Sequence, residues 1–301
     1  TSILFSLKLS DNIRSQFRMA DTLQRIILVN VVVYLGFAIV RAIMKLFMSS
    51  LDVYFIPSQW LAVPASLHAL LLKPWTLITY MFYHEEFFHI LFNMLWLFWM
   101  GKIFKEYLGN KKLLSTYVLG GISGAVLYIV AYNVFPLFSE SVNFSFALGA
   151  SAGVLAITVA AATLLPDYRI GLMFIGPVAL KYIAIVTVFL DLISVSGANA
   201  GGHIAHLGGA IFGFIYVKQL KQGRDIASWF NNLVDRIVSL FKGRSRMKVH
   251  YKRSAGDDAF VSGKKIKQER TDEILDKISK SGYGSLTNEE REFLFKSSRE
   301  N

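Results

Sequence analysis

The sequence predicts an all-α membrane protein, a bundle of six transmembrane helices with a small soluble helical C-terminal tail. The chain of 301 residues is 53% hydrophobic and only 18% charged, whereas a soluble domain is about 45–50% apolar and about 25% charged. Its mean hydropathy is +0.44. The charges are also uneven, because the first two thirds is mostly apolar and the last quarter is polar and basic. Such a chain is expected to bury its apolar surface in lipid.

Six apolar stretches approach the length of about 20 residues that a helix needs to cross a bilayer core. They cover residues 26–47, 87–104, 113–135, 149–165, 179–195 and 203–220. The fourth stretch is short and rich in alanine. We therefore predict a six-helix domain over residues 24–222, preceded by a cytoplasmic N-terminal segment at 1–23.

The basic residues of the short connections predict the orientation, because cytoplasmic loops carry an excess of Lys and Arg. One set of connections holds most of these residues, and the basic tail lies on the same side. The other set, around 49–86, 136–148 and 196–202, holds only Lys73. We expect a multi-pass protein of the cell (inner) membrane with both termini in the cytoplasm.

The connection at 49–86 is long, apolar and aromatic, and Pro57, Pro64 and Pro74 interrupt it. Proline in a helix interior removes a backbone donor and clashes with the preceding turn. An unbroken helix is therefore not expected here. We expect this segment to lie in the outer membrane interface, where Trp and Tyr are favoured.

The tail is predicted to fold separately. Residues 223–270 combine an amphipathic helix, near 225–242, with a basic linker, and 271–301 reads as a small cytoplasmic helical hairpin. Thr287 and Glu290 have the spacing of a capping box for its second helix. The net charge of +11 comes largely from basic residues in the tail and in the connections on the predicted cytoplasmic side. Membrane topology therefore explains it. The tail's aromatic residues do not alternate with its charges, so no nucleic-acid partner is expected.

Ser151 lies in the run Gly149-Ala150-Ser151-Ala152-Gly153, at the outer end of the fourth stretch. Glycines beside a serine allow close backbone approach and leave amide groups near the hydroxyl. Alone, this run more often indicates tight helix packing, because small residues favour close contact between membrane helices.

His206 shares one face of the sixth stretch with Gly209 and Gly213, at spacings of three and seven residues. The two glycines form a GxxxG pattern, so we predict that they pack this helix against another. The small-residue fourth stretch is the expected neighbour. That contact would place the imidazole of His206 beside the hydroxyl of Ser151, as a serine nucleophile requires.

His89 and Asn93 lie four residues apart, on one face of the second stretch. An imidazole and an amide there could stabilise an oxyanion, or could simply form an interhelical hydrogen bond. His84 is a weaker candidate. The predicted topology puts His89, Ser151 and His206 within one or two turns of the same depth, since all three stretches run inward from the outside.

Three segments together resemble the rhomboid family of intramembrane proteases. They are HEEFFHILFNMLWLFWMG (84–101), GASAG (149–153) and AHLGGAIFG (205–213). The resemblance covers about residues 23–220 and implies a six-helix rhomboid-like bundle. The segment 49–86 then matches the family's membrane-embedded first loop, and the fifth helix its substrate gate.

The resemblance implies an intramembrane serine endopeptidase that cleaves transmembrane protein substrates near the outer face of the bilayer. Ser151 would be the nucleophile and His206 the base of a Ser–His dyad. His89, Asn93 and the backbone around Gly149 would line the oxyanion site. Two features depart from many members of the family: Thr76 follows Trp75 where arginine is common, and Leu155 stands where a tyrosine often contacts the histidine.

Other functions remain open. An α/β-hydrolase would use Ser151, Asp191 and His206 in that order, but the long apolar stretches contradict its fold, and a triad role for Asp191 is not favoured. A catalytically inactive relative that binds membrane clients should lack the serine or the histidine. A transporter should carry acidic residues along a pore, which are missing.

No cofactor or metal is predicted. The chain has no cysteine, so thiolate metal sites, disulfides and a cysteine nucleophile are excluded. No nucleotide-binding loop is present. His203 and His206 have the spacing of a metal pair, but no carboxylate lies near them in the sequence. The oligomeric state is left open.

Overall fold

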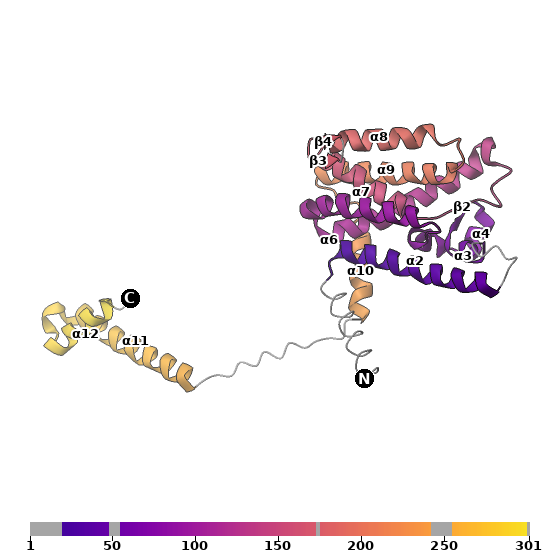
Figure 1. The fold of residues 1–301 in the computed structure, drawn as a ribbon. Helices are drawn as coiled ribbons and strands as arrows, with labels where there is room; N and C mark the ends of the chain where they lie inside the picture. Colours follow the sequence, from indigo (N-terminus) through magenta and orange to yellow (C-terminus); the bar gives the residue numbers. More distant parts are fainter. Residues whose placement is uncertain (1–19, 48–54, 173–174, 242–254, 300–301) are drawn as a thin grey trace. The chain divides into compact units, whose positions relative to one another are not determined.

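The computed structural model describes residues 20–47, 55–172, 175–241 and 255–299, and the chain divides into two compact units. The first unit ends at Phe241 and the second begins at Lys242. Figure 1 shows both units as ribbons. The expected N-terminal segment lies outside the described residues except for its last few, and so does the part of the basic linker at 242–254.

Each of the six apolar stretches is helical in the first unit. The long helices are α2 (Thr22–Phe47), α6 (Phe87–Val134), α7 (Ser151–Leu164), α8 (Leu180–Ile193) and α9 (Ala200–Lys221). Two predicted helices fall within α6. They are separated at Gly109, whose φ of 80° and ψ of 173° are not helical. Glycine reaches this backbone conformation without the clash of a Cβ atom.

Three of these helices are long and apolar enough to cross a bilayer: Thr22–Leu46, Phe87–Val134 and Ala200–Lys221. Exposed apolar side chains on α2 and α8, such as Leu35 and Phe189, suit contact with lipid rather than water. The helices α7 and α8 have 14 residues each, about 21 Å of rise against a bilayer core of about 30 Å. Six crossings therefore remain a prediction.

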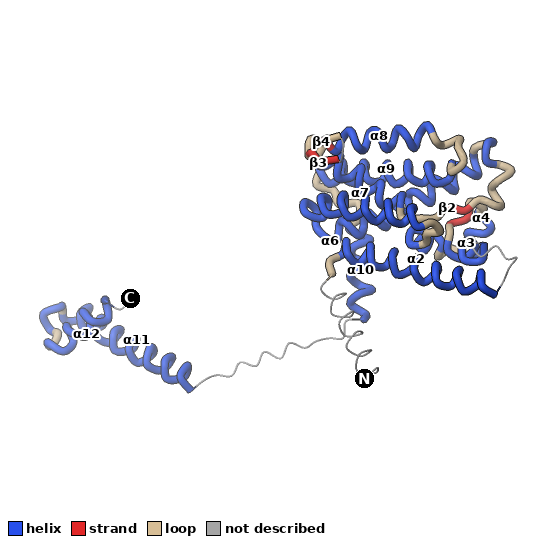
Figure 2. The backbone as a smooth tube through the Cα atoms, viewed as in Figure 1, coloured by secondary structure: helices blue, strands red, loops and turns tan. Residues whose placement is uncertain are grey.

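Small residues place α7 at the centre of the bundle, where every residue from Ala152 to Ala162 is buried. A Cβ at Gly120 of α6 would lie 2.2 Å from the Cβ of Ala156. Contacts of this kind let the backbones approach closely. Figure 2 shows α6, α7 and α9 side by side. Helix α8 contacts both α7 and α9, and α2 packs on α6.

The connection before α6 is not one unbroken helix within residues 55–86, as predicted. It contains three short helices and one 3-10 turn: α3 (Phe55–Leu61), α4 (Leu67–Leu72), α5 (Thr76–Thr79) and η1 (Tyr80–Phe82). The rings of Trp60 and Trp75 stack at 6.1 Å, and the Trp75 indole donates to the Trp60 carbonyl at 2.9 Å. The interfacial position of this segment stays a prediction.

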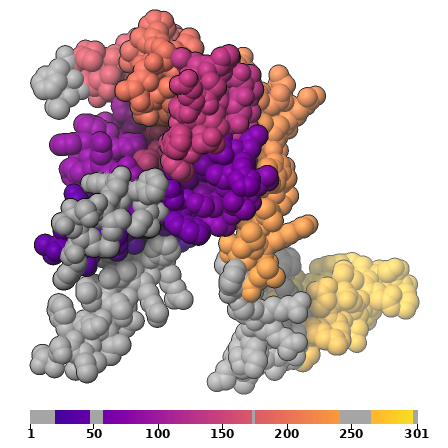
Figure 3. Space-filling model, turned by 90° about the vertical axis from the view of Figure 1, so that its right-hand side faces the viewer, coloured from indigo at the N-terminus to yellow at the C-terminus, as the bar shows by residue number. Residues whose placement is uncertain are grey.

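The described chain also contains two short antiparallel strand pairs, which an all-α prediction omits. Strand β1 (Val63–Pro64) pairs with β2 (Phe146–Ala147), so the connections before α6 and before α7 are neighbours on the face drawn in Figure 3. Strands β3 (Arg169–Leu172) and β4 (Gly176–Ala179) form a hairpin between α7 and α8. The β1–β2 pair lies just before the turn that leads into Ser151. The 3-10 turn η2 (Pro136–Phe138) follows α6.

Helix α10 (Ser228–Phe241) confirms that the predicted amphipathic segment is helical. The second unit contains α11 (Ala255–Ser281), the 3-10 turn η3 (Tyr283–Ser285) and α12 (Asn288–Arg299). Because α11 begins at Ala255, residues 255–270 of the expected linker are helical, and the hairpin is longer than predicted. The capping box is confirmed: Glu290 N donates to Thr287 Oγ1 at 3.3 Å, and Thr287 N donates to Glu290 Oε2 at 2.8 Å.

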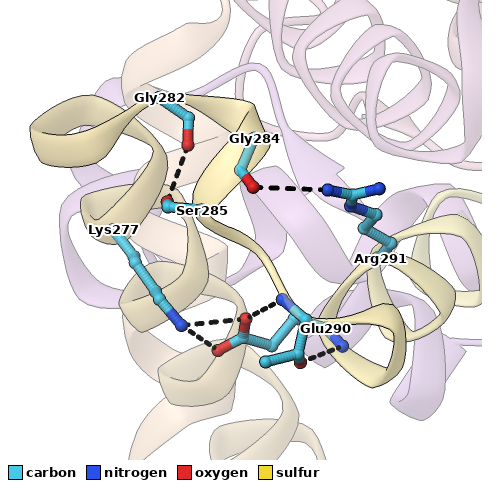
Figure 4. A network of polar contacts seen from close by, with 7 residues as sticks. Lys277, Gly282, Gly284, Ser285, Glu290 and Arg291 are labelled. Atoms are coloured by element: carbon cyan, nitrogen blue, oxygen red, sulfur yellow. Dashed lines mark hydrogen bonds and ion pairs between the residues drawn. The ribbon is translucent and has the colours of Figure 1, made fainter.

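Glu290 also ties α12 to α11, since Lys277 Nζ donates to both of its carboxylate oxygens at 2.8 and 3.0 Å (Figure 4). The Lys277 contact, followed by the Thr287 amide, holds the pKa of Glu290 below its ordinary value. A carboxylate with a lowered folded-state pKa stabilises the folded unit above its unfolded pKa, and this contribution disappears as the pH falls through the folded pKa.

We therefore expect Glu290→Gln to loosen the first turn of α12 at neutral pH. Amide hydrogen exchange in the full chain should become several-fold faster there than in the wild type, and the difference should vanish in acid. Glu289→Gln is the matched control, because Glu289 lies in the same first turn and has no such contacts in the described residues. Equal exchange in the two variants would contradict the role given to Glu290.

Candidate active site

Ser151 is the first residue of α7 and is half-buried. The turn before it has a fixed shape, because the Gly149 amide donates to the Tyr80 carbonyl at 2.8 Å. Gly149 has a φ of 105°, which strains any residue with a side chain. At a helix start the first amides have no acceptors within the helix. Amide donors and a hydroxyl therefore lie together at this end of α7.

The ring of His89 lies directly against Gly149. A Cβ on Gly149 would be 2.6 Å from Cε1 and 2.8 Å from Nε2 of His89. Asn93 is buried one turn further along α6, and its Nδ2 donates to the His89 carbonyl at 3.0 Å. The structure thus brings His89 to the turn before Ser151, with Asn93 on the same helix face.

His84 supports the same turn, a role that the sequence did not reveal. It is fully buried, and its Nε2 accepts a hydrogen bond from the Ala150 amide at 3.2 Å. Burial lowers the pKa of His84 to about 3, so the ring is neutral and Nε2 keeps the lone pair that this bond needs. Its ring centroid is 5.1 Å from that of His89.

The glycines of α9 pack against the backbone of α7. A Cβ on Gly209 would lie 2.1 Å from the Ala152 carbonyl oxygen, and one on Gly213 would lie 2.2 Å from that of Ala156. On α6, a Cβ on Gly124 would lie 2.6 Å from both the Ala152 Cβ and the Ala205 carbonyl oxygen. Ala152 follows Ser151 and Ala205 precedes His206, so the start of α7 and the His206 turn of α9 lie at one level.

Asp191 of α8 is a further member of this region. Its Oδ1 lies 2.8 Å from Nδ1 of His206 and 2.8 Å from Nδ1 of His203. No carboxylate lies near His203 and His206 in the sequence, but the fold brings Asp191 to both of them. The three potential ligand atoms lie within 4.8 Å of one another. The sequence did offer one sign of this role: Asp191 is an acidic residue in an apolar stretch. Charged residues within membrane helices usually have a function or a partner.

The contacts of Gly209 and Gly124 bring the Ser151 end of α7 and the His206 turn of α9 together. In the part of the chain that the structure describes, no hydrogen bond joins the Ser151 hydroxyl to His206, whose Nδ1 bonds Asp191. Catalytic hydrogen bonds are often long before substrate binds. An activated hydroxyl beside amide donors can perform acyl transfer.

Comparison with known proteins assigns residues 72–222 to the Rhomboid domain. Residues 256–300 match a family of unknown function, DUF6576. The chain is 30% identical over 158 residues to "RHOMBOID-like protein 12, mitochondrial" of Arabidopsis thaliana. The aligned region is 50% of this chain and 47% of that protein.

It is also 30% identical over 143 residues to "Presenilin-associated rhomboid-like protein A, mitochondrial" of Danio rerio, covering 45% of this chain and 35% of the relative. The chain therefore matches less than half the length of either relative.

Proposed function

Because the chain belongs to the rhomboid family, we propose that it is an intramembrane serine endopeptidase with Ser151 as nucleophile and His206 as general base. Its substrates are transmembrane segments of other proteins, cleaved near one face of the bilayer. The observation that carries the proposal is the contact between Gly209 and Ala152, which brings the His206 turn of α9 to the start of α7.

The reaction is peptide-bond hydrolysis by acyl transfer. His206 takes the proton of the Ser151 hydroxyl as the oxygen attacks the scissile carbonyl. The resulting oxyanion accepts hydrogen bonds from the amides at the start of α7 and from the side chains of His89 and Asn93. His206 then gives its proton to the leaving amine, and water hydrolyses the acyl-enzyme with the same histidine as base.

The turn around Gly149 holds the start of α7 in place. The Gly149 amide donates to the Tyr80 carbonyl and the Ala150 amide to His84, so neither is available as an oxyanion donor. The amides that follow, from Ser151 on, need little reorganisation when charge develops. The Asn93 side chain has two N–H donors. One bonds the His89 carbonyl at 3.0 Å, and the second can donate to the oxyanion, where a hydrogen bond to a charged oxygen is the stronger kind.

The membrane arrangement extends the proposal. The protein is an integral membrane protein, and six crossings would place both termini on one side of the bilayer. Both relatives are mitochondrial by name, which argues against fixing the location as the cell inner membrane. A substrate helix must unwind locally, because helical carbonyls are hydrogen-bonded, so small or helix-breaking residues near the cleaved bond should favour turnover.

The test is cleavage of a reporter in proteoliposomes that contain the purified full chain. The reporter carries one transmembrane segment, with Gly and Pro near one end in one version and Leu throughout in a second version. We expect cleavage of the first and slower or absent cleavage of the second. Absence of cleavage together with stable co-purification of the reporter would end the protease proposal and favour the inactive client-binding relative.

A further inference from the structure

A buried carboxylate on α8 joins two imidazoles on α9. Asp191 is 5% exposed, and one of its oxygens, Oδ1, bonds Nδ1 of both His203 and His206. Its other oxygen, Oδ2, is buried and has no hydrogen-bond partner among the described residues. A carboxylate in an apolar helix is costly unless it is partnered. The two histidines are the groups that stabilise it here.

This contact determines which nitrogen of each ring carries the proton. An ionised carboxylate only accepts hydrogen bonds. Both Nδ1 atoms must therefore be protonated for both bonds to form. A neutral imidazole with a proton on Nδ1 has its lone pair on Nε2. Nε2 of His206 is thus ready to accept a proton from a hydroxyl.

We propose that Asp191 is the positioning residue of His206, and that it extends the Ser151–His206 pair to a Ser–His–Asp triad across α7, α9 and α8. The inference rests on the proposed function. It assigns Asp191 two tasks: holding the ring in the Nδ1–H tautomer, and stabilising the imidazolium that forms when Ser151 loses its proton.

In the acylation step the protons balance among Ser151, His206 and the substrate, and the water that later hydrolyses the acyl-enzyme returns a proton to Ser151 through His206. The Ser151 proton moves to Nε2 of His206 as the bond from Oγ to the scissile carbon forms. The Nδ1 proton stays on His206 throughout and remains hydrogen-bonded to Asp191, which is never protonated. The Nε2 proton leaves with the amine when the peptide bond breaks.

His203 supports the carboxylate rather than the chemistry. It lies three residues before His206 on α9, and its bond to Oδ1 equals that of His206 in length, 2.8 Å. With two donors on one oxygen, the carboxylate cannot rotate without losing both bonds. His203 is therefore expected to limit the freedom of Asp191, and its loss should matter less than the loss of Asp191 itself.

The kinetic test uses Asp191→Asn in the full chain, in proteoliposomes with the cleavable reporter. An Asn amide can donate to Nδ1 and so favours the wrong tautomer of His206. We expect kcat to fall by about 10²–10⁴-fold, while KM changes by less than about threefold. Asp191→Glu should recover at least about tenfold of the loss, because it restores an acceptor with negative charge.

Two further variants are compared with Asp191→Asn. His203→Asn is expected to cost about tenfold or less in kcat, since His206 keeps its own bond to Asp191. Asp167→Asn should match the wild type, because Asp167 pairs with Lys181 at an exposed site away from the histidines. A wild-type kcat in Asp191→Asn would overturn the inference, and so would loss of wild-type activity on adding a chelator, which would make the cluster a metal site.

A second measurement does not depend on turnover. In protein labelled with ¹⁵N-histidine, NMR should show His206 with its proton on Nδ1, and Asp191→Asn should move it to Nε2. A wild-type His206 protonated on Nε2 alone would overturn the inference. The failures are distinguishable, because Ser151→Ala with wild-type cleavage ends the proposed function, whereas an active Asp191→Asn beside an inactive Ser151→Ala ends only the role of Asp191.

Discussion

Ser151→Ala is expected to reduce cleavage of a transmembrane reporter to background, a loss of at least about 10⁴-fold in kcat. The change removes the attacking oxygen and leaves the turn at Gly149 intact. Alanine at the start of α7 introduces no clash, because it is smaller than serine. The variant should therefore insert into membranes and unfold at the wild-type temperature, so that lost activity reports chemistry rather than folding.

His206→Ala and the double variant make this test stricter. A nucleophile and its base act as a unit, so removing both should cost little more than removing either one. Ser139→Ala is the control, because Ser139 lies in an exposed turn and donates only to the Pro136 carbonyl. Turnover above about one tenth of wild type in Ser151→Ala would contradict its assignment as nucleophile.

Gly209→Ala is expected to have the second largest effect, on both stability and activity. The added Cβ would meet the Ala152 carbonyl oxygen at 2.1 Å and its carbon at 2.8 Å. These are backbone atoms of a buried helix, so α9 must move away from α7. Overpacking of this kind costs about 1–3 kcal/mol, and a displacement of about 1 Å between reacting groups costs about 10²-fold in rate.

The measurements are the unfolding temperature in detergent and kcat for the reporter. Gly36→Ala is the matched control, because Gly36 lies within α2 and an added Cβ there would meet nothing within 4 Å. That control should be neutral or slightly stabilising, since alanine has the higher helix propensity. If Gly209→Ala were as stable and active as Gly36→Ala, the close contact of α7 with α9 would be wrong.

Much of the fold follows from local pattern. The apolar stretches predicted where the helices lie, because length and hydropathy dominate the choice of structure in lipid. The spacing of His206, Gly209 and Gly213 predicted which face of α9 packs tightly, since helical periodicity places them on one side. The number of crossings does not follow in the same way, because α7 and α8 are short and their depth depends on packing.

The contacts that the sequence did not reveal are long-range. Asp191 is 15 residues from His206, and their meeting depends on how α8 is rotated against α9, which no local pattern encodes. His84 is 66 residues from Ala150, and its role depends on where the connection before α6 folds. The helical start of α11 was also missed, because a basic, polar stretch has no apolar periodicity to reveal it.

Labelling with a fluorophosphonate, followed by peptide mapping, tests the central claim most directly. The probe bonds covalently to an activated serine hydroxyl and needs no knowledge of the substrate. We predict one labelled residue, Ser151, with labelling at least about 10²-fold slower in His206→Ala. Labelling at another serine, or equally fast labelling of Ser151 without His206, would contradict a nucleophile and base shared between α7 and α9.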